Sequence, residues 1–417
     1  MADQGGSQHG IARTSRVRTE EQKKRDLERI KKYRELEDQV RSHVSRGDYS
    51  PSVFQLTSKL LRLNPEYYTI WNTIGWVIML DGVLEYFSYR HYNTIFHQLL
   101  VIVVGHDPAR PRVPDSWEEC APDASGVRKD NNIEAATAAA AAAEQQDLST
   151  IKTELNFTIP LLLESPKCYW IWSYRLWILQ QAIQRLRSPL ARQIWEEELG
   201  LASKMLGKDR RNFHAWGYRR HVVAQLESAT LQGSSMVEAE FAYTERMINT
   251  DLSNFSAWHS RSKLIPRLLE ERGADDAARR AFLDEELNKI REALNVGPED
   301  QSLWYYHQFL VLNLVYPDKH PAMTRGLTTQ DRVAYLRREV DEIKDLLEDY
   351  TDVKLIYEGL FEYTLYLCQL EGRQPDTGER ADLVAWLGKL KRLDPMRNGR
   401  WADLERELGL KEGGGEE

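Results

Sequence analysis

The sequence is poor in cysteine, in net positive charge and in long hydrophobic runs. Its three cysteines (Cys120, Cys168, Cys368) have neither disulfide-framework nor metal-ligand spacing, which favours a reducing compartment. The formal net charge of −8 disfavours a general nucleic-acid-binding protein. The longest apolar run, residues 99–105, is too short for a transmembrane helix, and the charged N-terminus lacks the apolar core of a secretory signal. We therefore expect a cytoplasmic protein with no transmembrane segment and no nucleic-acid partner.

The sequence also lacks the motifs of a self-contained enzyme. It contains no Gly-rich phosphate loop, no HExxH segment, no paired-cysteine metal site and no Gly-x-Ser-x-Gly elbow. Its ten histidines are scattered, and none stands at ligand spacing from a cysteine or an aspartate. We therefore expect no metal site and no bound cofactor on this chain alone, and no activity without a partner.

A repeated segment of two helices is the main feature that the sequence does contain. Its clearest copy is residues 208–225, in which a polar turn leads into a helix that opens on a tryptophan. From the second copy onward the tryptophans are about 42–46 residues apart, a period typical of an α-solenoid. No alternating β pattern of useful length is present, so the sequence predicts an all-α fold, a right-handed α-α superhelix of helical hairpins. The anchor residues are Trp71, Trp172, Trp216, Trp258 and Trp304.

Two further residue types recur at fixed distances from the tryptophans. Asparagine stands four residues before (Asn212, Asn254), where it can cap the helix. We interpret tryptophan and asparagine as scaffold residues, because they bury area and bond the turn. Arginine stands three residues after, one helical turn along (Arg175, Arg219, Arg261). For the arginines two interpretations stay open: a bridge to the preceding turn, or projection into a concave surface.

The composition suggests where the repeats begin and where they are interrupted. Residues 1–19 are rich in Gly, Ser and Gln and are expected to be disordered. Residues 20–417 form the expected helical-repeat domain, with a low-complexity, exposed insertion at about 106–146 that separates Trp71 from Trp172. The expected first helix is 20–45. The predicted pairs are 52–63 with 71–80, 148–164 with 170–186, 189–206 with 215–226, 236–250 with 257–270, 275–294 with 303–315, 331–347 with 353–370, and 382–393 with 399–408.

The motif Asn-aromatic-x-x-Trp-x-x-Arg, repeated at this period, resembles the α subunits of protein prenyltransferases across residues 52–315. Within that family the sequence is most similar to the Rab geranylgeranyltransferase (type II) group. Animal members add immunoglobulin-like and leucine-rich-repeat domains, and no Leu-rich spacing follows residue 315, so the shorter fungal type is expected. The similarity to the type II group is carried by His9-Gly10 with the basic stretch 13–18, by residues 211–220, and by residues 300–302 before Trp304.

This resemblance implies a crescent of paired helices around a separate β subunit that holds zinc and the prenyl pocket. The heterodimer would transfer geranylgeranyl from geranylgeranyl diphosphate to C-terminal cysteines of Rab GTPases, which an escort protein presents. A zinc-bound thiolate would attack the first carbon of the prenyl chain, since zinc delivers a thiolate at neutral pH. The departing diphosphate gathers negative charge, which cationic groups stabilise.

The resemblance assigns the contribution of this chain to Lys167. In the family, a lysine in the pattern Pro-Lys-x-Tyr-x-x-Trp reaches the diphosphate, and residues 166–172 (PKCYWIW) fit that pattern. Tyr169 and His214 stand on neighbouring turns, where a role at the site and a role in packing are both open. Trp170 occupies the position at which farnesyltransferase-type subunits carry a glutamine for the carboxylate of a CaaX tail. An indole has no acceptor, so we expect an enzyme that does not read a CaaX end.

Two alternatives to this interpretation stay open. A shared α subunit of farnesyltransferase and geranylgeranyltransferase type I would have the same architecture and would act on CaaX proteins. A non-catalytic helical-repeat adaptor of the tetratricopeptide kind is disfavoured, because those repeats run about 34 residues and lack Trp-x-x-Arg after an asparagine turn. We further expect the escort protein to meet basic and aromatic positions on the later repeats.

Overall fold

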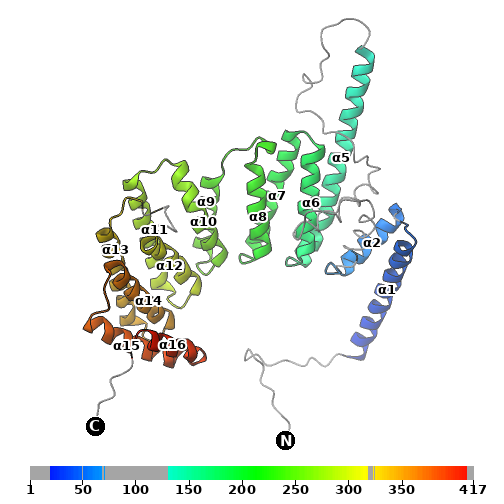
Figure 1. Cartoon of the computed structure of the whole chain (residues 1–417). Coiled ribbons are helices and arrows are strands. Elements are labelled where there is room, and N and C mark those ends of the chain that lie inside the picture. Colours follow the sequence, from blue (N-terminus) through cyan, green and yellow to red (C-terminus); the bar gives the residue numbers. More distant parts are fainter. Residues whose placement is uncertain are drawn as a thin grey trace. The chain divides into compact units, whose positions relative to one another are not determined.

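The structure, a computed structural model, describes residues 19–48, 50–67, 70, 130–317, 323 and 325–410. Every regular element within these ranges is a helix, and most consecutive helices form pairs (Figure 1). The prediction of an all-α fold built from helical hairpins is confirmed. Trp71, the predicted helix 71–80, nearly all of the N-terminal stretch 1–19 and most of the predicted insertion lie outside the described residues.

The chain divides into two compact units. The first comprises Met1–Ala202 and Gly217–Gly233, and the second comprises Ser203–Trp216 and Ser234–Glu417. In the first unit α1 packs on α2, and α5 packs on α6. Its helices are α1 (Glu20–Ser45), α2 (Pro51–Leu63), α5 (Asp130–Glu164), α6 (Tyr169–Arg185), the larger parts of α7 (Ser188–Lys208) and α8 (Phe213–Leu226), and the short η2 (Ala229–Leu231).

The second unit continues the hairpin pattern to the end of the described chain. Successive helices pair as α9 with α10, α11 with α12, α13 with α14 and α15 with α16, and the inner helices α10, α12 and α14 also pack on one another. The predicted pairs between residues 236 and 408 are therefore confirmed. The helices are α9 (Val237–Thr250), α10 (Phe255–Glu271), α11 (Asp276–Val296), α12 (Gln301–Val315), α13 (Thr329–Asp349), α14 (Lys354–Glu371), α15 (Thr377–Leu393), η3 (Pro395–Arg397) and α16 (Asn398–Glu407).

Local sequence signals account for several of the helix ends. Pro51 occupies the first turn of α2, where its missing N–H has no helical partner to lose. Gly372 ends α14 with a φ of 64°, a conformation that a residue with a Cβ rarely adopts. Reciprocal capping boxes, in which two side chains bond each other's backbone amides, open three helices. They are Thr19 with Gln22 in α1, Thr328 with Asp331 in α13, and Asp376 with Glu379 in α15.

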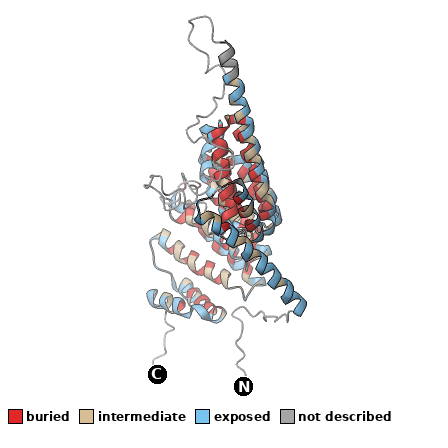
Figure 2. Ribbon diagram, turned by 90° about the vertical axis from the view of Figure 1, so that its right-hand side faces the viewer, coloured by how far each residue is buried: buried red, intermediate tan, exposed pale blue. Residues whose placement is uncertain are grey.

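Helix α5 differs from the sequence interpretation. Residues up to about 146 were assigned to the insertion, but a single helix of 35 residues runs from Asp130 into the repeat. Alanine is the best helix former, so the alanine tract extends the helix without needing an apolar face. Glu144 is only 4% exposed and its carboxylate lies 3.0 Å from Nε of Arg187, so packing begins before the predicted start at 148. Residues 136–143 of α5, which precede this contact, are mainly exposed (Figure 2).

Most helices of the repeats bury one face against their neighbours, as the red bands in Figure 2 show. The largest buried side chains are tryptophans, which supply much of the apolar area removed from water. They include Trp177, Trp195, Trp216, Trp258 and Trp401. Among the helices of the described part of the chain, none combines the length and the apolarity needed to span a membrane.

Candidate functional site at the repeat turns

Each anchor tryptophan among the described residues closes its own turn. Its indole N–H donates to a backbone carbonyl six residues earlier, in the turn before the helix. Because the indole is buried, this bond satisfies its one donor and fixes the turn against the helix. The pairs are Trp172–Pro166 (2.9 Å), Trp216–Arg210 (2.9 Å), Trp258–Leu252 (2.8 Å) and Trp304–Pro298 (2.6 Å), and Tyr357, which replaces tryptophan in the next repeat, bonds Thr351 (2.7 Å).

The asparagine before the tryptophan has two functions in the repeat of Asn254. Its Oδ1 accepts from the amide of Ala257 at 3.1 Å, which caps α10. Its Nδ2 donates at 2.9 Å to the carbonyl of Arg210, the same carbonyl that accepts from Trp216. Asn212 likewise accepts from two amides at the start of α8, at 3.0 and 3.2 Å. Asn254 therefore both starts its own helix and ties its turn to the turn of the preceding repeat.

The arginines after the tryptophan are buried in the core. Arg175 is 1% exposed; its Nε lies 3.0 Å from Oε2 of Glu198, and its Nη2 bonds the other oxygen. Tyr218 of the next repeat donates its hydroxyl to the same carboxylate. The Nη1 of Arg175 bonds the carbonyl of Leu155 at 2.6 Å and the hydroxyl of Thr158, both on α5. Arg175 thus joins the preceding outer helix to the following one and does not project into a concave surface. Arg219 is also buried, at 4% exposure.

A second arginine, carboxylate and tyrosine set repeats this arrangement. Arg261 Nε and Nη2 lie 2.8 and 2.5 Å from the carboxylate oxygens of Glu286, which also accepts from the hydroxyl of Tyr306. We call the acids at this place junction carboxylates. Burial pushes the pKa of Glu286 up, but the hydrogen bonds and charge of Arg261 outweigh burial and hold it below its usual value.

The first junction carboxylate, Glu154, has the tyrosine without the arginine. Its Oε2 accepts from the hydroxyl of Tyr174 at 2.7 Å, but the position three residues after Trp71 is Ile74. Burial therefore raises the pKa of Glu154. Sequence reasoning missed these acids, because a glutamate on an outer helix reads as a surface charge. One usable signal was present: each tyrosine follows its acid by 20 residues.

The last junction carboxylate, Glu339, faces a histidine at the arginine position. His307 is fully buried, and its Nε2 lies 3.1 Å from Oε2 of Glu339. Its Nδ1 lies 3.0 Å from the hydroxyl of Tyr363. Gly359 stands at the position of Tyr174, Tyr218 and Tyr306 in other repeats. A Cβ there would meet the ring of Trp304 at 2.7 Å. At this junction a histidine therefore bonds the carboxylate in place of the arginine, and a glycine in place of the tyrosine leaves room for the ring of Trp304.

The turn that carries Lys167 belongs to the first unit and is fixed on both sides of the lysine. Before it, the carbonyl of Pro166 accepts from the indole of Trp172. After it, Cys168 is 1% exposed and donates its thiol to the carbonyl of Pro65, at 3.3 Å. Burial raises the pKa of this thiol to about 11, so it stays protonated and can donate. The side chain of Lys167 itself is exposed.

The structure brings Lys167 and Tyr169 together at one turn. Tyr169 opens α6, is 40% exposed, and its ring centre lies 4.5 Å from that of Trp170. Trp170 is 5% exposed, so its indole belongs to the packed interior. His214 belongs to the second unit, on the first turn of α8, where it is half-buried beside the exposed ring of Phe213 at 4.1 Å.

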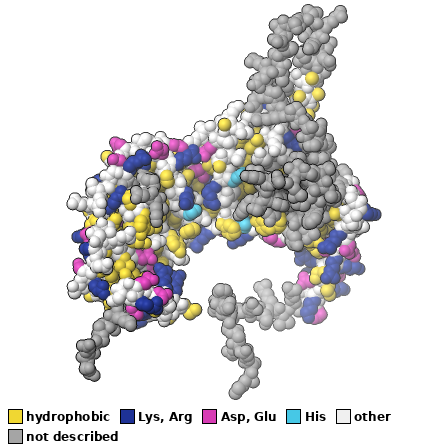
Figure 3. All heavy atoms as spheres, in the orientation of Figure 1, with side chains coloured by type: hydrophobic (Ala, Val, Ile, Leu, Met, Phe, Trp, Pro, Cys, Tyr) yellow, Lys and Arg dark blue, Asp and Glu magenta, His cyan; other side chains and the backbone are white. Residues whose placement is uncertain are grey.

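An aromatic groove of about 230 Å³ lies in the second unit between α10 and α12. Phe255 and Tyr305 form its exposed wall, with ring centres 5.8 Å apart, and His259 stacks on Phe255. Lys263 adds a cation to the lining. Figure 3 shows hydrophobic side chains reaching the surface of this unit among charged ones.

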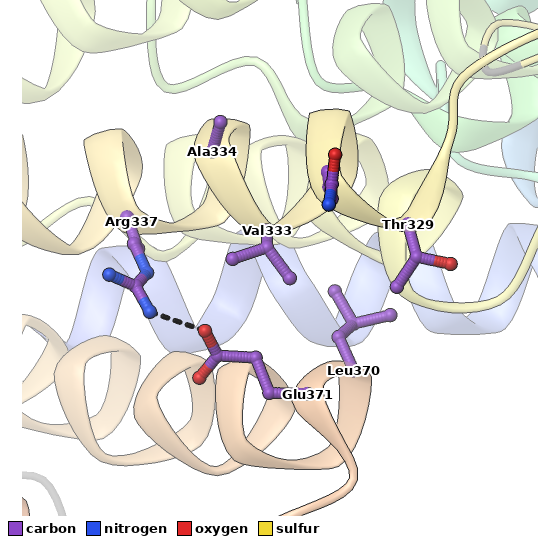
Figure 4. A pocket seen from close by; sticks show the side chains of 7 residues that line it. Thr329, Val333, Ala334, Arg337, Leu370 and Glu371 are labelled. Atoms are coloured by element: carbon purple, nitrogen blue, oxygen red, sulfur yellow. Dashed lines mark hydrogen bonds and ion pairs between the residues drawn. The ribbon is translucent and has the colours of Figure 1, made fainter.

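A larger hollow of about 480 Å³ lies between α13 and the end of α14, also in the second unit. Figure 4 shows Arg337 and Glu371 paired across it, with Val333 and Leu370 beside them. The two charges neutralise each other, so this hollow offers no cationic site for a diphosphate. Among the described residues, no group of three or more His, Cys, Asp or Glu side chains is arranged to hold a metal ion.

Comparison with known proteins identifies these repeats. The family described as "Protein prenyltransferase alpha subunit repeat" matches residues 51–80, 151–182, 195–226, 237–268 and 283–314. The chain carries protein prenyltransferase alpha-subunit repeats. Several of the matched segments each run from a junction carboxylate through the tryptophan to the arginine position, as in 195–226, which holds Glu198, Trp216 and Arg219.

Curated relatives of this chain carry the name "Geranylgeranyl transferase type-2 subunit alpha". The Schizosaccharomyces pombe protein is 29% identical over 408 residues, covering 96% of this chain and 98% of the relative. The Candida albicans protein is 27% identical over 428 residues, covering 95% and 97%. The Rattus norvegicus protein is 28% identical over 345 residues, covering 79% of this chain and 48% of the relative.

A solved structure shares the fold. A chain of the "Candida albicans protein geranylgeranyltransferase-I complexed with GGPP" superposes with a TM-score of 0.51 at 18% identity, covering 91% of each chain. This likeness supports the prenyltransferase α-subunit fold and, at that identity, says nothing about the substrate.

Proposed function

We propose that this chain is the α subunit of a heterodimeric protein geranylgeranyltransferase of type II. It pairs with a β subunit, and the heterodimer transfers geranylgeranyl from geranylgeranyl diphosphate to C-terminal cysteines of Rab GTPases presented by an escort protein. The names of relatives that align over nearly their whole length support the type II assignment. The observation that carries a role in chemistry is the exposed Lys167 on a turn whose backbone is bonded on both sides.

The proposed role of Lys167 follows from where charge develops in the reaction. A cysteine thiol of the Rab loses its proton, a bond forms between sulfur and the first carbon of the prenyl chain, and the carbon–oxygen bond breaks. The electron pair of that bond leaves with diphosphate, which becomes more negative. An ammonium group held nearby stabilises this charge more in the transition state than in the bound substrate, and therefore raises the rate.

A fixed backbone makes such a lysine more effective. The indole of Trp172 bonds the carbonyl of the peptide group before Lys167. The amide of Cys168, in the peptide group after Lys167, donates to the carbonyl of Ser165 at 3.1 Å. Only the side chain then has to be ordered when the diphosphate binds, so less free energy is lost in reorganisation. In this proposal zinc belongs to the β subunit. The described residues of this chain offer no ligand cluster for it, and no step assigned to this chain passes through it.

The aromatic groove between α10 and α12 supports the expectation that the escort protein meets the later repeats. Phe255 and Tyr305 are 48% and 51% exposed, a large apolar area for a surface, and Lys263 lies beside them. Exposed aromatic side chains next to a cation are typical of binding hot spots. Lys263→Glu and Tyr305→Ala should each weaken escort binding about tenfold or more, measured by titration of the purified heterodimer. Unchanged binding in both variants would contradict this part of the proposal.

The runner-up is a shared α subunit that acts on CaaX proteins. The burial of Trp170 bears on this choice, because a packed indole has no acceptor at the position where a CaaX-reading subunit carries a glutamine. This observation supports the type II assignment, in agreement with the names of the aligned relatives.

The deciding experiment uses the chain co-expressed with candidate β subunits. Transfer of labelled geranylgeranyl is followed to a two-cysteine Rab, with and without escort protein, and to a CaaX peptide. Lys167→Ala should lower the single-turnover rate by roughly 10- to 100-fold, as expected for the loss of one cationic donor. The control Lys204→Ala, an exposed lysine on α7, should keep the wild-type rate.

Each result has a definite meaning. Escort-dependent transfer to the Rab that depends on Lys167 supports the proposal. Efficient transfer to the CaaX peptide moves the assignment to the runner-up. A chain that forms no complex with any β subunit is better explained as a helical-repeat adaptor.

A further inference from the structure

The residue four positions before the tryptophan differs in the repeat that carries Lys167. In three other repeats this residue accepts a hydrogen bond from a backbone amide of the following helix; these residues are Asn212, Asn254 and Asp300. In the Lys167 repeat the residue is Cys168, and its sulfur makes no cap hydrogen bond to α6. A thiol is a weak donor and a weak acceptor, so this helix start lacks the bond that the others have.

Cys168 keeps the other function of the asparagine. Asn254 donates to the carbonyl of Arg210, six residues before the tryptophan of the preceding repeat. Cys168 donates to the carbonyl of Pro65, which also lies six residues before the tryptophan of the preceding repeat, Trp71. The two bonds are therefore equivalent ties between successive turns.

This tie acts next to the proposed diphosphate-binding lysine. Lys167 is flanked by Pro166, whose carbonyl is held by Trp172, and by Cys168, whose side chain reaches the first repeat. The bond of Trp172 fixes the turn to its own helix, and the bond of Cys168 fixes it to the neighbouring repeat. Without the thiol, the turn keeps the bond from Trp172 to Pro166 but loses its bond to the preceding repeat.

We propose that Cys168 is a positioning residue for Lys167. Its thiol bonds the carbonyl of Pro65 and so holds the turn of Lys167 against the turn of the preceding repeat. The ammonium group of Lys167 then starts from a fixed backbone position relative to that repeat. This inference rests on the proposed function of Lys167. It adds the residue that holds this lysine in place.

The test uses the purified heterodimer and single-turnover transfer to the Rab with escort protein. Cys168→Ala removes the tie and should lower the rate about 3- to 10-fold, the equivalent of one modest hydrogen bond, while Kd for the Rab–escort complex is unchanged. Cys168→Val removes the donor at nearly constant volume and should give the same loss. Cys168→Ser restores a donor and should return the rate to within about twofold of wild type.

Two controls separate positioning from general stiffness of the repeats. Asn254→Ala removes the equivalent tie, together with the cap of α10, in a repeat without the lysine. At a saturating concentration of the Rab–escort complex it should leave the single-turnover rate unchanged. In a Lys167→Ala background, adding Cys168→Ala should cause no further loss, because the cysteine acts through the lysine. Faster hydrogen exchange at the start of α6 in the alanine and valine variants would show that the turn has loosened as expected.

The outcomes distinguish this inference from the proposed function. A wild-type rate in both Cys168→Ala and Cys168→Val, together with a slow Lys167→Ala, overturns the inference alone. An undiminished cysteine effect in the Lys167→Ala background, or an equal loss in Asn254→Ala, also overturns it. A wild-type rate in Lys167→Ala removes the role of the lysine and with it the premise of this inference.

Discussion

Glu154 and Glu286 occupy the same place in two repeats and are held in different ways. Each lies on an outer helix, is almost fully buried, and accepts the hydroxyl of a tyrosine 20 residues later. Glu286 also receives two bonds from Arg261, whereas the repeat before Glu154 has Ile74 at the arginine position. Burial raises the pKa of Glu154, and in Glu286 the arginine reverses that effect.

The comparison shows what the arginine of the repeat motif does. A buried carboxylate with only a hydroxyl partner is costly when ionised, and a buried arginine without a carboxylate cannot avoid that cost by losing its proton. Together they form an ion pair at the junction between two repeats. The motif therefore acts through contacts between neighbours, which suits a fold whose units cannot bury their faces alone.

The largest effect is expected from removing the arginine of the complete junction. Arg261→Ala leaves Glu286 buried without its cation and should lower the local opening free energy of α10–α12 by about 3–5 kcal/mol. Hydrogen exchange of peptides from these helices measures this quantity. Arg267→Ala is the matched control, because that arginine pairs with Glu271 on the exposed face of the same helix. It should change the value by less than about 0.5 kcal/mol.

A smaller loss with a defined pH dependence is expected for Glu286→Gln. The charge of Arg261 keeps Glu245 as a partner at 2.8 Å, so the loss at pH 7 should be about 2–3 kcal/mol. Because the pKa of Glu286 is lowered on folding, its stabilisation is present above the unfolded pKa of about 4.3 and is lost as pH falls through the folded pKa. The difference between wild type and variant should therefore shrink below about pH 4.3, and a constant difference down to pH 3 would contradict the assignment.

The two tyrosines should differ in a way that follows from the arginine. Tyr174→Phe removes the hydroxyl partner of Glu154 where no arginine replaces it, and should cost about 2 kcal/mol. Tyr306→Phe leaves Glu286 bonded to Arg261 and should cost about 1 kcal/mol. Hydrogen exchange of α6 and α12 peptides measures the two losses. Equal losses of stability in the two variants would show that Arg261 does not compensate for the missing hydroxyl of Tyr306.

The smallest expected effect is a gain in stability, on replacing Glu154. Because the pKa of Glu154 is raised on folding, its favourable contribution is present below about pH 4.3 and is lost as pH rises through the folded pKa. Glu154→Gln keeps an acceptor for Tyr174 and removes the charge, so at pH 7 it should stabilise α5 and α6 by up to about 1 kcal/mol. At pH 4 the variant and the wild type should be alike. A clear loss of stability in Glu154→Gln at pH 7 would contradict the proposed difference between Glu154 and Glu286.

The sequence was sufficient for the repeat period and for most hairpins of the second unit. The Trp-anchored turns and the apolar spacing carry that information locally, so the predicted pairs agree with the helices from α9 to α16 within a few residues. The junction carboxylates were missed because their burial depends on a helix from the next repeat. The same reason left the arginines undecided, since Arg175 finds Glu198 only after two hairpins have stacked.

Two other features could not be read from local pattern. The alanine tract before residue 148 has no apolar face, yet it continues α5 because helix propensity and the pair of Glu144 with Arg187 are sufficient. The sequence suggested Lys167 only through resemblance to a family motif. The structure adds the bonded turn around it, which no spacing rule predicted, because the carbonyl of Pro65 lies in another repeat.

The short span of the turn-closing bonds has a consequence for how the chain is made. Each anchor tryptophan among the described residues bonds a carbonyl only six residues before it, so a turn can close as soon as its second helix has emerged from the ribosome. Contacts of such low sequence separation form in microseconds, while the ribosome adds about 5–20 residues per second. Successive hairpins can therefore fold during translation in the order in which they are synthesised. The repeats would then be in place when the finished chain meets its partner subunit.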